Sequence, residues 1–236
     1  MLFLQLALLA ILGAIAELDR TSVFHGLFSE PIVLAPVVGL ILGEPVLGLK
    51  VGAILQLFFL GSVSMGGSSP PDGAIAALVV TAAAVMGADY ANLTSQVATQ
   101  VAVPVAVLLV MAPSAQAGKA VYEWLKERNV SLVRQAEEDI VLHGVNAVKS
   151  ALWRSVASSF AVFALMSVVL TSLGAAITGM ALIWLPRDWW SAMEISGWLL
   201  TFAAAGVALA AVREKRAMWV YGGAGALLLA ITVYTV

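Results

Sequence analysis

Long apolar segments separated by short polar connectors run along almost the whole chain, and this pattern constrains the fold more than any other feature. Of the 236 residues, 61% are hydrophobic and 11% are charged, whereas a soluble domain is about 45–50% apolar and about 25% charged. A soluble globule of this size could not bury so much apolar surface, because a large part of any globule faces water. We therefore expect residues 1–236 to form a single membrane domain, an all-α polytopic helical bundle.

Composition and motifs exclude several classes of function. The net charge of −2 gives no basis for nucleic-acid binding. The chain has no cysteine, which excludes disulfides, thiolate metal sites and cysteine nucleophiles. It has two histidines and no H-E-x-x-H or G-x-S-x-G motif, so no constellation for a metal site or an intramembrane enzyme is present. We expect neither a metal, nor a cofactor, nor catalysis in this chain.

The apolar segments predict helices, several of which are shorter than the roughly 20 residues that a spanning helix needs. The first lacks the basic region of a signal peptide, so we expect it to be retained as a helix. Gly43-Glu44-Pro45 predicts a turn between two short segments, which suggests discontinuous helices or a re-entrant hairpin. The expected segments are 2–16, 31–42, 46–60, 74–86, 92–118, 155–185, 197–212 and 217–236.

Two glycine patterns, Gly39-x-x-x-Gly43 and Gly48-x-x-x-Gly52, lie in these short segments. Small residues at this spacing let helix backbones approach closely in lipid. They predict tight packing, either within a hairpin or against a partner subunit.

Residues 117–149 differ from the rest because they carry many charged side chains. Ala117, Val121, Trp124 and Leu125 fall on one helical face of this segment, which predicts an amphipathic cytoplasmic or interfacial helix. Basic residues gather in the connector 119–154 and at 213–216. The positive-inside rule therefore places these two regions in the cytoplasm and the connector 186–196 outside.

The link Gly61–Gly73, with the sequence GSVSMGGSSPPDG, cannot form a regular helix. Irregular backbone at membrane depth is tolerated where it is buried in protein or lines a watery cavity. Short, interrupted apolar segments also indicate the binding site of a transporter. The alternative is an ordinary loop outside the membrane between two tilted helices.

An ordered set of residues in the first third of the chain resembles the IIC subunit of the mannose/sorbose-type sugar phosphotransferase system (PTS). The second half is similar more loosely, through its charged middle segment and a closing pair of apolar segments. The residues that carry the resemblance are Asp19-Arg20-Thr21, Pro31-Ile32-Val33, Gly39-Leu40-Ile41-Leu42-Gly43, Gly52-Ala53-Ile54-Leu55-Gln56-Leu57, Leu60-Gly61 and Gly66-Gly67-Ser68-Ser69-Pro70-Pro71-Asp72.

The resemblance implies a multi-pass permease in the inner (plasma) membrane of a bacterium. Such a subunit binds a hexose-like sugar and moves it inward with a sister membrane subunit, IID, in trimers of IIC–IID pairs. Phosphoryl transfer is then expected on separate IIA and IIB components, so the chain itself is not an enzyme. An alternative is a regulatory or scaffold subunit that keeps the fold without transport, because Gln56 and Glu30 stand where glutamate and arginine are usual in the family.

Six residues near the irregular link are candidates for sugar binding. Asp72 could accept hydrogen bonds from sugar hydroxyls, or it could be the N-cap of the following helix. Gln56 lies in an apolar run where its amide needs a partner, either the sugar or a neighbouring helix. The candidate substrate-binding residues are Gln56, Asp72, Ser68, Ser69, Gly66 and Gly67.

Overall fold

The computed structural model describes residues 2–21, 27–62 and 69–212, and within these ranges the chain is helical with short turns and no strand. Five helical stretches there are long and apolar enough to cross a membrane. The expected all-α polytopic fold is therefore confirmed, whereas the segment 217–236 lies outside the described residues. The elements are α1 Leu2–Thr21, α2 Pro31–Leu42, α3 Pro45–Phe59, α4 Gly73–Tyr90, α5 Ser95–Val97, the π-helix η1 Ala98–Ala102, α6 Val103–His143, α7 Val145–Trp184, the 3-10 turn η2 Arg187–Trp189 and α8 Trp190–Val212.

The helices α2 and α3 form a tight hairpin, as the sequence predicted. Gly43 ends α2 with a φ of 89°, a left-handed conformation that favours glycine. The next backbone N–H, that of Glu44, donates to the carbonyl of Gly39 at 2.7 Å. A Cβ on Gly39 would lie 3.1 Å from the Cα of Gly48. The glycines of the two patterns therefore allow α2 and α3 to pack closely against each other.

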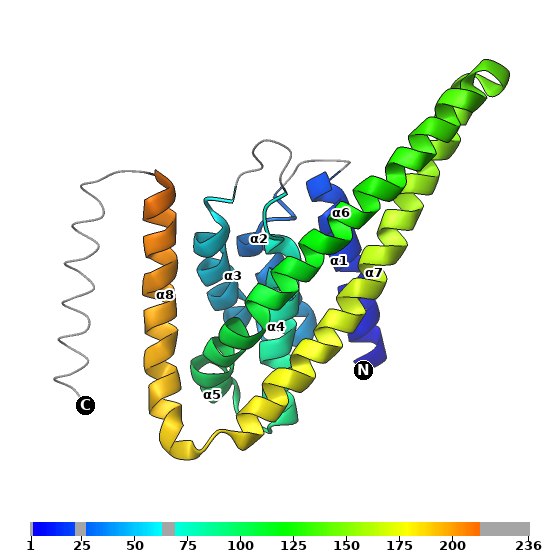
Figure 1. The fold of residues 1–236 in the computed structure, drawn as a ribbon. Coiled ribbons are helices and arrows are strands. Elements are labelled where there is room, and N and C mark those ends of the chain that lie inside the picture. The colour runs from blue at the N-terminus through cyan, green and yellow to red at the C-terminus, as the bar shows by residue number, and fades with distance from the viewer. Residues whose placement is uncertain (1, 22–26, 63–68, 213–236) are drawn as a thin grey trace.

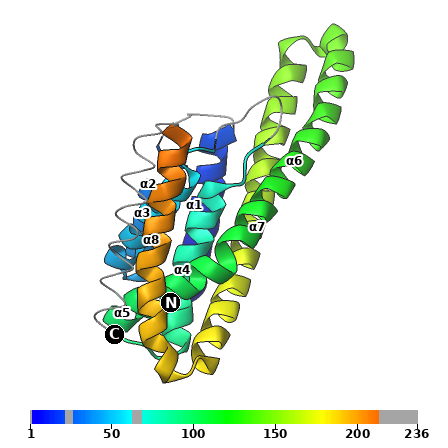
Figure 2. The ribbon, with the colours of Figure 1, turned by 60° about the vertical axis from the view of Figure 1, so that its left-hand side comes forward.

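The helix α4 is the centre of the bundle and is buried on nearly every side. It packs against α1, α2, α3, α6 and α7, and Figure 2 shows it in the middle of the bundle. Its alanine-rich sequence permits this, since small side chains let neighbouring backbones come close. At Gly174 of α7, for example, an added Cβ would lie 3.2 Å from the Cβ of Ala83.

The helices α6 and α7 run far beyond the bundle as a two-helix arm (Figure 1). They are joined by a turn at Gly144, whose φ is 56°. The predicted amphipathic segment 117–149 is helical, but it is not a separate helix: it continues the apolar part of α6 through Pro113 and includes the start of α7. The π-helix η1 ends two residues before Pro104, where the missing proline N–H interrupts the α-helical pattern.

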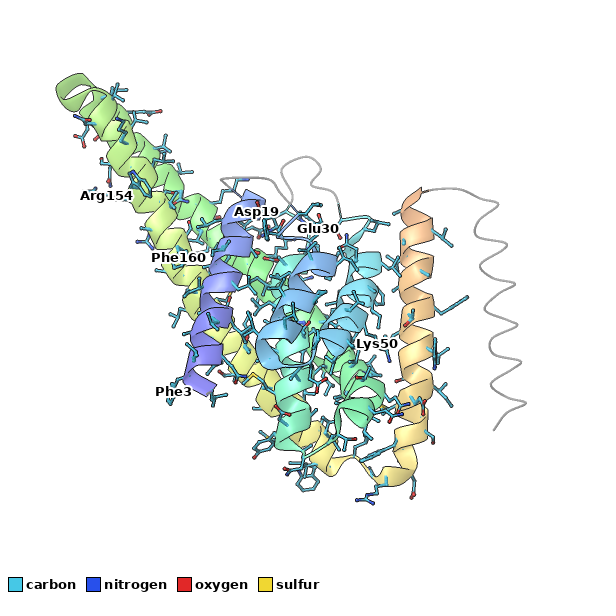
Figure 3. All side chains as sticks on the ribbon, turned by 180° about the vertical axis from the view of Figure 1, so that it is seen from behind. Phe3, Asp19, Glu30, Lys50, Arg154 and Phe160 are labelled. Atoms are coloured by element: carbon cyan, nitrogen blue, oxygen red, sulfur yellow. The ribbon has the colours of Figure 1, made fainter. Side chains whose placement is uncertain are left out.

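The helix α8 returns along the other side of the bundle and packs beside α3 and η1 (Figure 3). Polar contacts connect these elements inside an apolar setting. The ammonium group of Lys50 donates to the carbonyl of Thr99 at 3.0 Å. The amide of Gln100 donates to the Glu194 carboxylate at 3.2 Å. The π-helix thus supplies a backbone acceptor for a cation that would be costly in lipid without a partner.

Candidate functional site

Four helix ends meet at the end of the bundle from which the arm projects (Figure 1). They are the C-terminal ends of α1 and α3 and the N-terminal ends of α2 and α4. Between them lies a polar cavity of about 210 Å³, which we call the four-end cavity. Its lining residues are Arg20, Ser29, Glu30, Pro31, Phe59, Ser62, Pro70, Pro71, Gly73 and Ala74.

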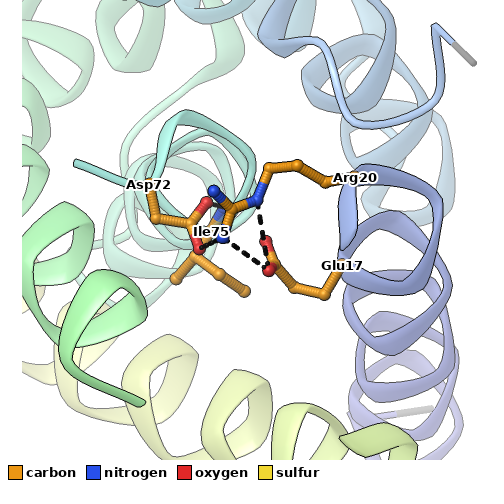
Figure 4. A network of polar contacts seen from close by, with 4 residues as sticks. All are labelled: Glu17, Arg20, Asp72 and Ile75. Carbon is orange, nitrogen blue, oxygen red and sulfur yellow. Dashed lines mark hydrogen bonds and ion pairs between the residues drawn. The ribbon is translucent and has the colours of Figure 1, made fainter. Parts of the chain in front are cut away.

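One wall of the cavity is held by a buried charge cluster, shown in Figure 4. The Nη2 atom of Arg20 donates to Glu17 at 2.9 Å and to Asp72 at 3.1 Å. Both carboxylate side chains have no exposed surface, whereas the Arg20 side chain is 23% exposed. The guanidinium also lies 5.1 Å from the centre of the Tyr122 ring, a cation–π distance. Arg20 is therefore fixed at the cavity wall by α1, α4 and α6 together.

Asp72 is the N-cap of α4, which confirms that interpretation of its position. Its side chain accepts from the backbone N–H of Ile75 at 3.0 Å, and its own N–H donates to the carbonyl of Ala115 at 3.0 Å. Gly118 of α6 packs directly against the carboxylate, since an added Cβ would lie 2.6 Å from Oδ2. Asp72 does not line the cavity, and its oxygens already bind Ile75 and Arg20.

Gln56 forms a hydrogen bond between helices, one of the two roles considered from the sequence. Its Nε2 donates to Glu30 at 2.7 Å, and its Oε1 accepts from the N–H of Ile32 at 3.1 Å. The two positions that depart from the family pattern are thus in direct contact. A glutamate at position 56 would repel Glu30, whereas the amide can donate to it. Gln56 and Glu30, the two departures from the family pattern, are therefore compatible with each other because they form this hydrogen bond.

The other candidates from the sequence divide into two groups. Ser69 is buried, with 8% exposure, and directly precedes the lining residues Pro70 and Pro71. Gly66, Gly67 and Ser68 lie outside the described residues. Within the described ranges, no group of three or more His, Asp or Glu side chains could hold a metal ion.

Sequence reasoning missed the residues that face the cavity, Arg20 and Glu30 among them. Arg20 pairs with a carboxylate 52 positions away, and nothing in the local pattern indicates that contact. Glu30 was singled out from the sequence only as a departure from the family pattern, although an acidic residue directly before Pro31 also marks a helix N-terminus. That position indicates a cap but does not indicate a cavity.

Comparison with known proteins assigns the family. The family described as "PTS system sorbose-specific iic component" matches residues 3–236. The chain therefore belongs to this family and is a IIC membrane component of a sugar phosphotransferase system of the mannose/sorbose type. The resemblance noted in the sequence is thereby confirmed.

Individual relatives agree with this assignment. Over 102 residues the chain is 38% identical to a protein of Escherichia coli (strain K12) named for an N-acetylgalactosamine permease IIC component 2, covering 42% of this chain and 74% of the relative. Over 77 residues it is 35% identical to the PTS system sorbose-specific EIIC component of Lacticaseibacillus casei, covering 33% of this chain and 26% of the relative.

Two solved structures share the fold at 18% identity. Each comparison covers 99% of this chain and 96% of the other. One is described as the structure of a membrane protein, with a TM-score of 0.67. The other is the cryo-EM structure of the mannose transporter ManYZ in complex with microcin E492, with a TM-score of 0.60.

Proposed function

We propose that this chain is the sugar-translocating IIC subunit, which binds a hexose-like sugar and moves it inward together with a IID partner. The observation that carries the proposal is the four-end cavity, a small polar space at one end of an otherwise apolar bundle. Its volume of about 210 Å³ is below the roughly 300–1,000 Å³ of pockets for drug-sized ligands. A single sugar ring is a ligand of the appropriate scale.

The lining groups suit a sugar chemically. Ser29 and Ser62 can each donate and accept hydrogen bonds, and Glu30 accepts them. The ring of Phe59 supplies an apolar surface for the C–H face of a sugar. Among the candidates from the sequence, Asp72 and Gln56 act on the site by holding Arg20 and Glu30.

Four candidates in the irregular link complete the proposed site. Ser69 directly precedes the lining residues Pro70 and Pro71. We propose that Gly66, Gly67 and Ser68, which precede Ser69 in the same link, contribute backbone and hydroxyl groups to the sugar.

The position of the cavity supports inward delivery. The helix ends around it lie at the same end of the bundle as the α6–α7 arm (Figure 1), and the positive-inside rule places that arm in the cytoplasm of a bacterial cell. A sugar bound there would be next to the compartment in which separate IIA and IIB components transfer the phosphoryl group. The chain itself would need no cofactor.

We propose that the α6–α7 arm is the surface to which the IID subunit binds. A second cavity of about 310 Å³ lies between α6 and α7 along the arm. It is lined mainly by apolar side chains, and Val133, Val148 and Leu152 remain exposed there. Exposed apolar surface rimmed by charges is typical of protein interfaces. Assembly into trimers of IIC–IID pairs is part of the same proposal.

The test is sugar binding by the complex of this chain co-expressed with its IID partner. Ser62→Trp should fill the four-end cavity and abolish binding, while complex assembly is retained. Ser172→Trp is the matched control, because Ser172 is an exposed residue of α7 away from the cavity. Wild-type affinity in Ser62→Trp would contradict the proposed site. A wild-type complex that binds no sugar would instead favour a regulatory or scaffold subunit.

A further inference from the structure

A mainly apolar cavity of about 390 Å³ lies at the end of the bundle away from the arm. Its walls come from α1, α2, α4 and α7 and include Gln5, Leu42, Met86, Asp89 and Met180. We call it the outer cavity. It is formed by the N-terminal end of α1 and the C-terminal ends of α2 and α4, whereas the opposite ends of these helices form the four-end cavity (Figure 1). Because the positive-inside rule places the arm in the cytoplasm, the outer cavity lies toward the external side of the membrane.

The outer cavity opens onto the apolar surface of the bundle. Leu2 and Met180 line the cavity and are themselves exposed. Next to them along the chain, Phe3 and Leu4 of α1 and Ile177 of α7 are also exposed. The apolar lining therefore continues into the surfaces of two helices that are long and apolar enough to cross a membrane. In a membrane, such surfaces face the acyl chains of lipids.

The polar lining residues come from the outermost turns of two helices. Gln5 lies near the start of α1, and Asp89 and Tyr90 are the last two residues of α4. The Tyr90 ring packs against α7, since a Cβ on Gly179 would lie 2.8 Å from its Cδ1 atom. The apolar Met86 lies almost one helical turn deeper in α4. The outer cavity is thus polar at the membrane boundary and apolar below it, which is the polarity of a phospholipid.

The carboxylate of Asp89 determines which headgroup suits the outer cavity. Among the described residues that line it, Asp89 is the only charged one, and it forms no ion pair with a described basic side chain. Glu44, at the turn between α2 and α3, adds a second negative charge that interacts with Asp89. Arg187 of the connector 186–196 lies 5.9 Å from the ring centre of Trp190. Two like charges at this boundary favour a cationic group that donates hydrogen bonds.

We propose that the outer cavity binds a phospholipid with a primary ammonium headgroup, phosphatidylethanolamine, with an acyl chain in the cavity and the ammonium hydrogen-bonded to Asp89. The acyl chain alone gives little preference, because the lipid that it leaves is equally apolar. The headgroup contact therefore determines which lipid is retained. The ammonium carries three N–H donors, whereas the trimethylammonium of phosphatidylcholine has none. Phosphatidylglycerol brings a net negative charge toward two carboxylates.

The experiment is native mass spectrometry of the delipidated, co-expressed complex, titrated with phosphatidylethanolamine, phosphatidylcholine and phosphatidylglycerol that carry identical acyl chains. Phosphatidylethanolamine should bind roughly two- to fivefold more tightly than the other two, as expected for an exposed charge pair. Asp89→Asn should remove this preference. Asp188→Asn is the matched control, because Asp188 is an exposed carboxylate at the same end of α7 that does not line the cavity. This control should keep the preference.

A second pair of variants tests the acyl-chain part of the site. Ala176 is an exposed lining residue of α7, so Ala176→Trp should fill the cavity from the lipid side without entering the core. The tightly bound phosphatidylethanolamine should then be lost. Ala203→Trp places the same side chain at an exposed alanine of α8, outside the cavity, and should retain the lipid.

The α-amino group that precedes Leu2 is a competing cation for Asp89. The titration is therefore repeated with a short extension before Met1, and the preference should be the same in both forms. A preference that appears only with the extension would assign Asp89 to the amino group of the chain itself and overturn the proposal.

Three other results would also overturn it. Equal binding of the three lipids by the wild-type complex, or a preference that persists in Asp89→Asn, would exclude the headgroup contact. An unchanged amount of bound lipid in Ala176→Trp would exclude the cavity as the site of the acyl chain. A loss of complex assembly in Ala176→Trp without a change in bound lipid would show that a protein segment occupies the cavity instead.

Discussion

Replacing Arg20 by methionine should be among the most destabilising single changes at this end of the bundle. Arg20 is the counter-ion of two carboxylates without exposed surface, at 2.9 Å from Glu17 and 3.1 Å from Asp72. Removing one partner of a buried ion pair typically costs about 3–5 kcal/mol, because a charge is left buried without compensation. For a chain of 150–250 residues, 1 kcal/mol corresponds to roughly 2–4 °C in melting temperature. We therefore expect Arg20→Met to lower the melting temperature by roughly 6–20 °C.

The measurement is thermal unfolding of the purified complex, followed by intrinsic tryptophan fluorescence in detergent. The triple variant Glu17→Gln/Arg20→Met/Asp72→Asn should recover most of the loss, since it removes all three charges of this cluster together and asparagine still caps α4. Lys119→Met is the control: Lys119 and Glu123 form a pair at 3.9 Å with 29% and 48% side-chain exposure. Such a pair contributes about 0–1 kcal/mol.

Two results would refute this reasoning. A wild-type melting temperature for Arg20→Met would show that the ion pairs contribute nothing to stability. A triple variant that melts as low as the single variant would show that the loss comes from packing against Tyr122 rather than from uncompensated charge.

Three further predictions concern packing and topology. Gly118→Ala places a Cβ 2.6 Å from Asp72 Oδ2 and should cost about 1–3 kcal/mol through overpacking; an unchanged melting temperature would contradict that contact. Gly48→Val directs a side chain at a carbonyl oxygen of α2 that lies 2.5 Å from the Cβ position, so the α2–α3 hairpin should open and the yield of assembled complex should fall. Single cysteines in this cysteine-free chain should react with a membrane-impermeant maleimide in intact cells at Ser191 but not at Glu127, and the reverse pattern would overturn the orientation.

Much of the fold follows from local features of the sequence. Apolar segment lengths indicate the helices, and Gly43-Glu44-Pro45 marks the α2–α3 turn because glycine tolerates the left-handed conformation and proline begins the next helix. The continuity of 117–149 with α6 and α7 could not be predicted in this way. An apolar stripe beside a charged face is compatible with a helix on the membrane surface and equally with one half of a two-helix arm.

The sugar-binding role of the candidate residues stays a prediction. The described ends of the irregular link, at Ser62 and at Pro70 and Pro71, line the polar cavity. Capping chemistry identified the position of Asp72 at the start of α4. The partners of Arg20 and Gln56 are set by tertiary packing between α1, α3 and other helices. A single sequence holds no local pattern that indicates such contacts, so the residues that face the cavity emerged only from the structure.

The second cavity, between α6 and α7 along the arm, has a consequence for how the stability of the chain depends on the concentration of a binding partner. A partner that covers this cavity binds the folded arm and not the unfolded one. It therefore raises the apparent free energy of unfolding by RT ln(1 + [L]/Kd), where [L] is the concentration of free partner. At a partner concentration 100 times the Kd, this amounts to about 2.7 kcal/mol. The half-life of the subunit in a cell should therefore rise with the supply of its partner, and stoichiometry would be maintained without a dedicated regulator.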